Sequence, residues 1–300
     1  MISKVLKKIF SFKKTEPVSY DYDLANLPLI DTDNFVHLFE NEYFHEFYNQ
    51  AKDLNSKGYC TLSFRDKNWL NKIDNLRLEL STYEEFKEHP KKNLTLARSQ
   101  DAWLHKKSTL VKEIACEKRI LNCLATLYGR NPFPFQTLNF KFGSTQHIHS
   151  DSVHFNTLPH GFMCGVWIAL EDVKEDSGPL IYYPQSHRTP YISSKSLGIK
   201  MELINNTSTP QKLFEQYWVD LIEKSNFKKE KFLAKKGDIL IWHANLIHGG
   251  EIIKNKNLTR WSQVTHYFFE NCAYLTPFFD VVDEKSSNKK WRKPFNILQI

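Results

Sequence analysis

Residues 146–154 read QHIHSDSVH, which places three histidines and one aspartate within nine residues. Side chains two positions apart on an extended strand point to the same side. His149 and Asp151 can therefore reach one metal ion, offering a neutral ring nitrogen and an anionic oxygen. His248 follows an apolar strand pattern and is the predicted third ligand. Two histidines and one carboxylate form the facial triad of non-haem Fe(II) oxygenases, which leaves coordination positions for a cosubstrate and O₂.

A cation downstream of His248 fits the same interpretation. Oxygenases of this type that use 2-oxoglutarate need a positive group for its far carboxylate. Arg260 lies twelve residues after His248, and a turn through residues 254–257 would return it along the neighbouring strand. A planar guanidinium suits bidentate contact with a carboxylate. Ser262, two positions further, would face the same side and donate a hydroxyl hydrogen bond.

The surrounding sequence predicts a mainly β fold with flanking helices. Short aromatic and β-branched segments are separated by turn signals such as DSGP at residues 176–179, a spacing typical of a sandwich or jelly roll. The predicted strands are residues 59–64, 135–142, 163–170, 180–183, 232–234, 239–242 and 261–269. The predicted helices are residues 44–56, 110–128 and 213–222. We therefore expect a double-stranded β-helix, the cupin-like jelly roll, as the core.

Composition excludes several classes of protein. No run of roughly 18 apolar residues exists, so the sequence predicts no transmembrane helix. The five cysteines are scattered without CxxC spacing, which fits a reducing cytoplasm rather than a disulfide framework or a zinc ribbon. The net charge of +7 comes from the two ends, because residues 1–14 and 289–300 hold nine basic residues and no acid. The rest has 32 basic and 34 acidic residues, so we expect no nucleic-acid partner.

In their order along the chain, these motifs resemble the phytanoyl-CoA dioxygenase family of Fe(II)/2-oxoglutarate oxygenases. The resemblance covers residues 44–270. Its parts are a helix followed by Gly58-Tyr59, then His149-x-Asp151, CGVWIAL at 164–170, SGPL at 177–180, PQSH at 184–187, Gly237-Asp238, LIHG at 246–249 and Arg260. Each part alone is common, whereas the complete order is specific.

The resemblance implies a role for each matching residue. The implied roles are iron binding by His149, Asp151 and His248, and cosubstrate binding by Arg260, Trp167 and Ser262. It also implies that an unactivated C–H bond of a small organic molecule is hydroxylated while 2-oxoglutarate is converted to succinate and CO₂. Ser150 and Gln185 stand where the family often has Gln and Gly. The substrate specificity of family members is therefore not transferred to this sequence.

Two alternatives stay open at this point. His147-x-His149 resembles the first metal motif of cupin-type enzymes, although the glutamate that would follow is absent, and His154 is spaced to compete as a ligand. The second alternative is a catalytically silent jelly roll that binds a metal or ligand at a membrane surface. His187 and His243 are predicted to be structural or to line the substrate cavity.

The ends of the chain bear on where the protein works. We predict an N-terminal extension over residues 1–43, a jelly-roll domain over 44–270 and a C-terminal extension over 271–300. On a helical wheel, the apolar residues of 2–10 lie opposite lysines, as is typical of a helix on an anionic membrane surface. A helix packed on its own domain, or a frayed tail, stays open. A peripheral contact of residues 1–14 with the inner face of the membrane favours a surface-glycan or lipid-linked sugar precursor as substrate.

Overall fold

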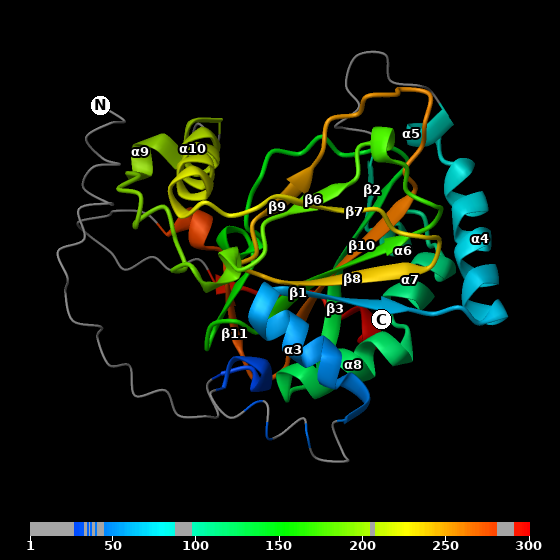
Figure 1. Cartoon of the computed structure of the whole chain (residues 1–300), viewed down its shortest axis with the longest axis horizontal. Helices are drawn as coiled ribbons and strands as arrows, with labels where there is room; N and C mark the ends of the chain where they lie inside the picture. The colour runs from blue at the N-terminus through cyan, green and yellow to red at the C-terminus, as the bar shows by residue number, and fades with distance from the viewer. Residues whose placement is uncertain are drawn as a thin grey trace.

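A six-stranded antiparallel sheet is the framework of the computed structural model (Figure 1). The structure describes residues 27–32, 35, 37, 40, 45–87, 98–204, 208–280 and 291–300. The strand order is β1-β8-β5-β10-β3-β2, so segments far apart in the sequence lie side by side. The strands are β1 (Tyr59–Ser63), β2 (Arg98–Gln100), β3 (Pro132–Phe140), β5 (Met163–Ala169), β8 (Asp238–His243) and β10 (Ser262–Phe269).

Two three-stranded sheets complete the β structure of the described residues. The first has the order β7-β6-β9 and consists of β6 (Leu180–Tyr182), β7 (Glu230–Phe232) and β9 (His248–Gly250). The second has the order β12-β11-β4 and consists of β4 (Asn156–Leu158), β11 (Ala273–Leu275) and β12 (Trp291–Arg292). Residues of the large sheet and of the β7-β6-β9 sheet line one cavity, as in the facing sheets of a jelly roll.

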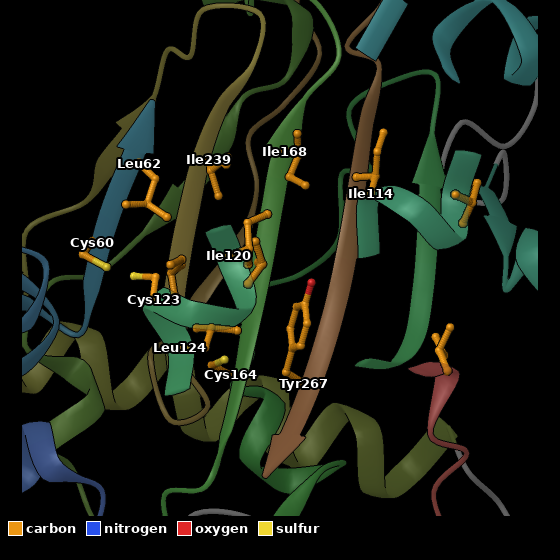
Figure 2. Close-up of a cluster of buried hydrophobic side chains, with 14 of the residues drawn as sticks. Cys60, Leu62, Ile114, Ile120, Cys123, Leu124, Cys164, Ile168, Ile239 and Tyr267 are labelled. Carbon is orange, nitrogen blue, oxygen red and sulfur yellow. The ribbon is translucent and has the colours of Figure 1, made fainter. Parts of the chain in front are cut away.

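Helices cover the large sheet on the face opposite to this cavity. Ile114 and Leu124 of two helices pack against Ile168 of β5 and Ile239 of β8, and none of these side chains has exposed surface (Figure 2). Burial of each such side chain contributes about 1.5–3 kcal/mol. The α-helices of the described residues are α3 (Tyr48–Lys57), α4 (Lys67–Ser81), α5 (Glu84–Lys87), α6 (Ala102–His105), α7 (Thr109–Ala115), α8 (Lys118–Tyr128), α9 (Met201–Ile204) and α10 (Ser208–Ser225).

Alternation along β10 decides which side chains reach the cavity. Tyr267 faces the helices, because its hydroxyl donates to the Ala115 carbonyl at the end of α7 at 2.7 Å. Ser262, Val264 and His266 alternate with it and therefore point to the opposite face. That face carries the site described below.

The strand register extends this alternation into rows across the sheet. His266 lies opposite Gly165 of β5. Ser262 lies opposite Phe140 of β3, which in turn lies opposite Arg98 of β2. Paired residues present their side chains on the same face, so each row delivers side chains from several strands to one place.

The predicted helix over residues 110–128 is wrong as a single element. It consists of α7 and α8, and the chain turns between them at Cys116 and Glu117. Glu117 has φ −58° and ψ 118°, and its carboxylate accepts a hydrogen bond from Arg119 Nε at 2.9 Å. An acidic group is favoured at the N-terminal end of a helix, so α8 begins anew at this position.

Helix α4 is absent from the sequence-based expectation. Asp66 caps it, because its side chain accepts from the Trp69 amide at 2.9 Å. The buried residues Trp69, Ile73, Leu76 and Leu80 recur at helical spacing along it. The other predicted elements overlap α3, β1, β3, β5, β6, β7, β8, β10 and α10.

The described C-terminal residues pack on the sheets. Strand β11 pairs with β4, and the Ile297 side chain has no exposed surface. The predicted amphipathic helix of residues 2–10 lies outside the described residues. Across the residues that the structure describes, no helix has the length and apolar character needed to cross a bilayer. All five cysteines are free.

Candidate metal centre

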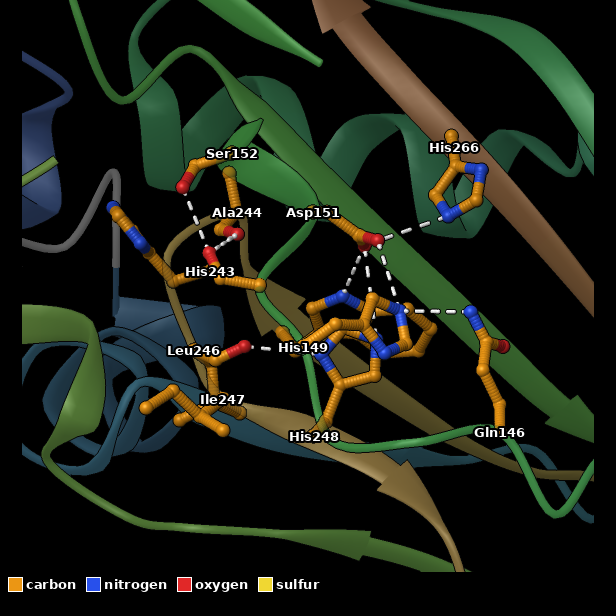
Figure 3. A network of polar contacts seen from close by, with 12 residues as sticks. Gln146, His149, Asp151, Ser152, His243, Ala244, Leu246, Ile247, His248 and His266 are labelled. Atoms are coloured by element: carbon orange, nitrogen blue, oxygen red, sulfur yellow. Dashed lines mark hydrogen bonds and ion pairs between the residues drawn. The ribbon is translucent and has the colours of Figure 1, made fainter. Parts of the chain in front are cut away.

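Backbone pairing brings the three predicted metal ligands together (Figure 3). His149 and His248 form an antiparallel bridge in which each amide donates to the other's carbonyl, at 2.8 and 2.9 Å. Asp151 does not continue a strand from His149, contrary to the prediction, because the His154 amide donates to its carbonyl and closes a 3-10 turn over residues 151–153. The potential ligand atoms of the three side chains still lie within 4.8 Å of one another, so one ion can touch all three.

Backbone carbonyls orient both histidine rings. His149 Nδ1 donates to the His147 carbonyl at 2.8 Å, and His248 Nδ1 donates to the Leu246 carbonyl at 3.0 Å. In this tautomer both Nε2 atoms are acceptors close to Asp151, at 3.6 Å from His149 Nε2 to Oδ1 and at 3.8 Å from His248 Nε2 to Oδ2. Metal-binding imidazoles characteristically use their second nitrogen in this way. The Gln146 side-chain nitrogen donates to His149 Nε2 at 3.2 Å, a contact that a metal ion would replace.

Burial sets the protonation states that a metal requires. His149, Asp151 and His248 are 7%, 4% and 5% exposed. Burial, followed by the nearby His149 ring, lowers the pKa of His248 to about 4. Burial alone would raise the pKa of the Asp151 carboxyl, but the His248 and His266 rings hold that pKa well below its usual range. At neutral pH His248 therefore offers a neutral imidazole and Asp151 an ionised carboxylate, the forms that bind metal ions.

Two residues outside the predicted set hold the Asp151 carboxylate. Trp242 Nε1 donates to Asp151 Oδ2 at 2.8 Å, and His266 Nε2 lies 3.5 Å from the same oxygen. The Gln136 side-chain oxygen lies 3.0 Å from His266 Nδ1 and fixes that ring. The sequence does contain a signal for His266, because it is a polar residue at a position of β10 whose side chain faces the cavity.

Gly165 makes room for Trp242 beside the carboxylate. A Cβ atom at Gly165 would lie 2.2 Å from two carbons of the Trp242 indole, well inside any real contact distance. Gly165 lies opposite Trp242 on the neighbouring strand β8. The absence of a side chain in β5 therefore lets the indole cross the strand and reach Asp151.

Arg260, the cation predicted to bind the cosubstrate, is buried, and part of its hydrogen-bonding capacity is unused among the described residues. The Arg260 side chain is 2% exposed, and one terminal nitrogen donates to the Phe142 carbonyl at 3.2 Å. Among the described residues, neither Arg260 Nε nor the buried Ser262 hydroxyl has a hydrogen-bond partner. Burial lowers the pKa of Arg260 to about 10, so the guanidinium is cationic at neutral pH. A buried cation with unused donors is suited to a carboxylate ligand.

One cavity of about 280 Å³ joins the three potential metal ligands to Arg260. Its wall includes Trp167, whose ring centroid lies 5.5 Å from Arg260 Cζ. Ser262 is not part of the wall, and its hydroxyl is buried in the sheet. The cavity thus connects the site residues predicted from the sequence, with Ser262 set back from it.

The other histidines singled out in the sequence lie outside the group of three. His154 lines the same cavity, and burial lowers its pKa to about 4. His187 Nε2 donates to the Asn55 carbonyl at 2.9 Å, and His243 Nδ1 accepts from the Asn245 amide at 3.1 Å. Both rings line a separate cavity, so their contacts fit the predicted structural role.

Comparison with known sequences gives an independent match. The sequence model of the phytanoyl-CoA dioxygenase family (PhyH) matches residues 54–260. A curated relative, Phytanoyl-CoA dioxygenase domain-containing protein 1 from Danio rerio, is 28% identical over 153 residues, which make up 48% of this chain and 48% of the relative. The match thus spans about half the length of that relative.

Solved structures share the fold. The epimerase SnoN from nogalamycin biosynthesis, in complex with Fe³⁺, alpha ketoglutarate and nogalamycin RO, has a TM-score of 0.56 at 18% identity, covering 84% of this chain and 96% of SnoN. EctD from S. alaskensis, with 2-oxoglutarate and 5-hydroxyectoine, has a TM-score of 0.57 at 16% identity, covering 82% and 83%. The predicted fold class and family resemblance are both confirmed. Because the family model covers more than half of the residues, this chain belongs to the phytanoyl-CoA dioxygenase family.

Proposed function

We propose that the protein is an Fe(II)- and 2-oxoglutarate-dependent dioxygenase that hydroxylates an unactivated C–H bond of a small organic substrate. The observation that carries this proposal is one cavity in which two buried histidines and a buried carboxylate face a buried guanidinium with unused donors. Membership of the phytanoyl-CoA dioxygenase family supports it.

The residues present fit both the metal and the cosubstrate. His149 Nε2, His248 Nε2 and an oxygen of Asp151 would hold Fe(II), because all three are within reach of one ion. Arg260 would bind the far carboxylate of 2-oxoglutarate through its unused donors. When bound, iron together with 2-oxoglutarate and O₂ supplies the oxidising chemistry, which yields succinate, CO₂ and a hydroxylated substrate.

Trp167 and Ser262 would complete the cosubstrate site. The Trp167 ring forms a flat wall next to the Arg260 guanidinium, so it would lie beside the cosubstrate chain. The Ser262 hydroxyl is buried and has no partner in the described part of the chain, and it would donate to the carboxylate held by Arg260 after a small movement toward the cavity. Both roles can be separated from iron binding, since neither side chain belongs to the group of three potential ligands.

The chain itself orients the reactants and excludes water. Trp242 donates to one oxygen of Asp151 and His266 lies 3.5 Å from the same oxygen, so these two side chains would fix the carboxylate beside the metal position. The apolar side chains of Leu138 and Val264 line the same cavity and would help to exclude water from the reacting centre. Such fixed dipoles and excluded water are the usual protein contribution to this kind of chemistry.

Substitution of a ligand tests the proposal directly. Asp151→Ala should bring the Fe(II)- and O₂-dependent conversion of 2-oxoglutarate to succinate down to background, because the centre loses its anionic ligand. Arg260→Ala should keep iron binding and raise the KM for 2-oxoglutarate roughly 10- to 100-fold, since hydrogen bonds to charged groups contribute about 1.5–3 kcal/mol. His105→Ala, which removes an exposed histidine of α6, is the control. Full turnover in Asp151→Ala would refute the assignment.

We also propose a surface-glycan or lipid-linked sugar precursor as the substrate. The basic amphipathic pattern of residues 2–10 supports it, as do the amides of Gln100, Gln136 and Gln146 in the cavity wall, which suit hydroxyl groups. Deletion of residues 1–14 should abolish salt-sensitive cosedimentation with vesicles that contain anionic lipid. Cosedimentation that survives the deletion would contradict the membrane part of this proposal.

A further inference from the structure

The cavity of the candidate metal centre continues into an outer chamber that the proposed chemistry does not use. A second cavity of about 380 Å³ adjoins the inner one of about 280 Å³. The two share the wall residues Arg98, Phe140, Ser144, Gln146, His149 and His154. Gln211 and Glu215 of α10 line the outer side. Ligand sites usually measure about 300–1,000 Å³, so the joined chamber has room for a substrate beside the cosubstrate.

Arg98, an exposed residue, lines this chamber and has no partner for its guanidinium among the residues that the structure describes. It is the first residue of β2 and lies opposite Phe140 of β3, another wall residue. Ser99 is 4% exposed and belongs to the other face of the strand, whereas Gln100 again faces the inner cavity. Among the described residues, none accepts a hydrogen bond from the Arg98 guanidinium or forms an ion pair with it. Its positive charge and its five N–H donors are therefore left for a ligand.

The other charged groups that line the two cavities either bind the cosubstrate or the metal in the proposed function, or have a hydrogen-bond partner. In the proposed function, Arg260 binds the cosubstrate and Asp151 binds the metal. Glu215, at the outer side, accepts from Gln211 Nε2 at 3.0 Å. Arg98 is thus the cation of the chamber wall that remains uncompensated. A guanidinium in this situation favours a carboxylate or a phosphate, because its planar fork can donate two parallel hydrogen bonds to either group.

The wall around Arg98 is rich in neutral polar groups. The amides of Gln100, Gln146 and Gln211 and the hydroxyl of Ser144 provide both donors and acceptors. A ligand with hydroxyl or amide groups would pair with them. Gln146 and Gln211 each use an amide nitrogen for one hydrogen bond and keep further donors and acceptors. A purely alkyl ligand would bury those remaining groups unpaired, at about 1–3 kcal/mol for each one. The chamber therefore suits a polar molecule better than a bare hydrocarbon chain.

We propose that the substrate is a polar molecule with a carboxylate or phosphate group, and that Arg98 binds this group at the outer chamber while the reacting carbon faces the metal. This inference rests on the proposed function, because it takes the inner cavity as the place of the cosubstrate. Arg98 acts here as a specificity residue that selects and orients the substrate through its anionic end.

Matched sugars test this inference by binding alone. The full-length protein is loaded with Mn(II) and 2-oxoglutarate, and the affinities for glucose, glucuronate and glucose 6-phosphate are measured by calorimetry. At least one anionic sugar should bind about tenfold or more tightly than glucose, consistent with a charge-assisted contact of about 1.5 kcal/mol or more. Arg98→Gln should remove this preference. Glu215→Gln, which neutralises the carboxylate of the same wall, is the matched control and should keep or increase the preference.

Each result decides one question. A preference for glucuronate points to a carboxylate substrate, and a preference for glucose 6-phosphate points to a phosphate. Equal affinities for the three sugars, no measurable binding of either anion, or a preference that persists in Arg98→Gln would overturn the inference. The proposed function is judged separately, by Fe(II)-dependent conversion of 2-oxoglutarate to succinate in the wild-type protein without any sugar. Loss of the sugar preference leaves that activity standing, whereas absence of that activity refutes the function itself.

Discussion

Trp242 constrains the Asp151 carboxylate with a single N–H. Trp242→Phe keeps the aromatic packing and removes the donor to Oδ2, which lies 2.8 Å from the indole nitrogen. The freed carboxylate can rotate, so we expect the dissociation constant for Fe(II) or Mn(II) to rise about 10- to 100-fold, the usual effect of removing an outer contact to a metal ligand. Calorimetric titration of the metal-free protein measures this change.

Trp69→Phe provides the matched control for that measurement. Trp69 is equally buried and donates its indole N–H to the Gly237 carbonyl at 3.1 Å, on the helix side of the sheet. This control should lose some stability while its metal affinity stays at the wild-type value. An unchanged metal affinity in Trp242→Phe would show that the indole only fills space.

Single residues differ in how far the sequence predicts them. His149, Asp151, His248 and Arg260 can be singled out from their side-chain chemistry and spacing, and the structure places them around one cavity. Trp242 and His266 cannot be singled out in this way, because their contacts to Asp151 depend on which strands are neighbours in the sheet. That information lies in the register rather than in local sequence.

At the level of elements, strand β5 depends on one missing side chain. Gly165→Ala would place a methyl group 2.2 Å from the Trp242 indole, so the strand or the ring must move. Overpacking of this kind costs about 1–3 kcal/mol of unfolding free energy. Urea denaturation should show the loss, with a parallel drop in metal affinity because the indole is displaced from Asp151.

A double-mutant cycle identifies the cause of that loss. In a Trp242→Ala background the alanine at position 165 meets no ring, so its cost should nearly vanish. A cost that is the same in both backgrounds would place the strain elsewhere in β5.

Elements were predictable where periodicity was strong and less so where the chain turns. The aromatic and β-branched runs place β5, β8 and β10 correctly. The helix break at Glu117 escapes the apolar pattern, because α7 and α8 both bury apolar residues and the pattern alone does not mark the turn. The turn after Asp151 escapes it as well, since backbone hydrogen bonds set that geometry.

For the whole molecule, His187 makes stability depend on pH. Burial, followed by the neighbouring His243 ring, lowers the pKa of His187 to about 4. The unfolded chain takes up this proton near pH 6.5 and the folded chain near pH 4. The free energy of unfolding should therefore fall as the pH falls from about 6.5 to about 4, by up to roughly 3 kcal/mol from this residue.

Comparison of the wild type with His187→Gln isolates the contribution of His187 to this pH dependence. Denaturation at several pH values between 4 and 7 should show a smaller loss of unfolding free energy in the variant. The buried Nδ1 of His187 has no hydrogen-bond partner among the described residues, which agrees with a ring that is neutral in the folded state. Identical pH profiles for the two proteins would show that other groups cause the acid sensitivity.

The reciprocal amide–carbonyl pair between His149 and His248 joins two of the proposed ligands by the backbone rather than by the metal. An ion that leaves the centre would therefore leave its binding groups in position, and a new ion would need no refolding step. Loss and rebinding of iron would then not require the synthesis of a new polypeptide chain. We expect activity after a period of iron starvation to return as fast as Fe(II) is supplied, from molecules that were synthesised before the starvation began.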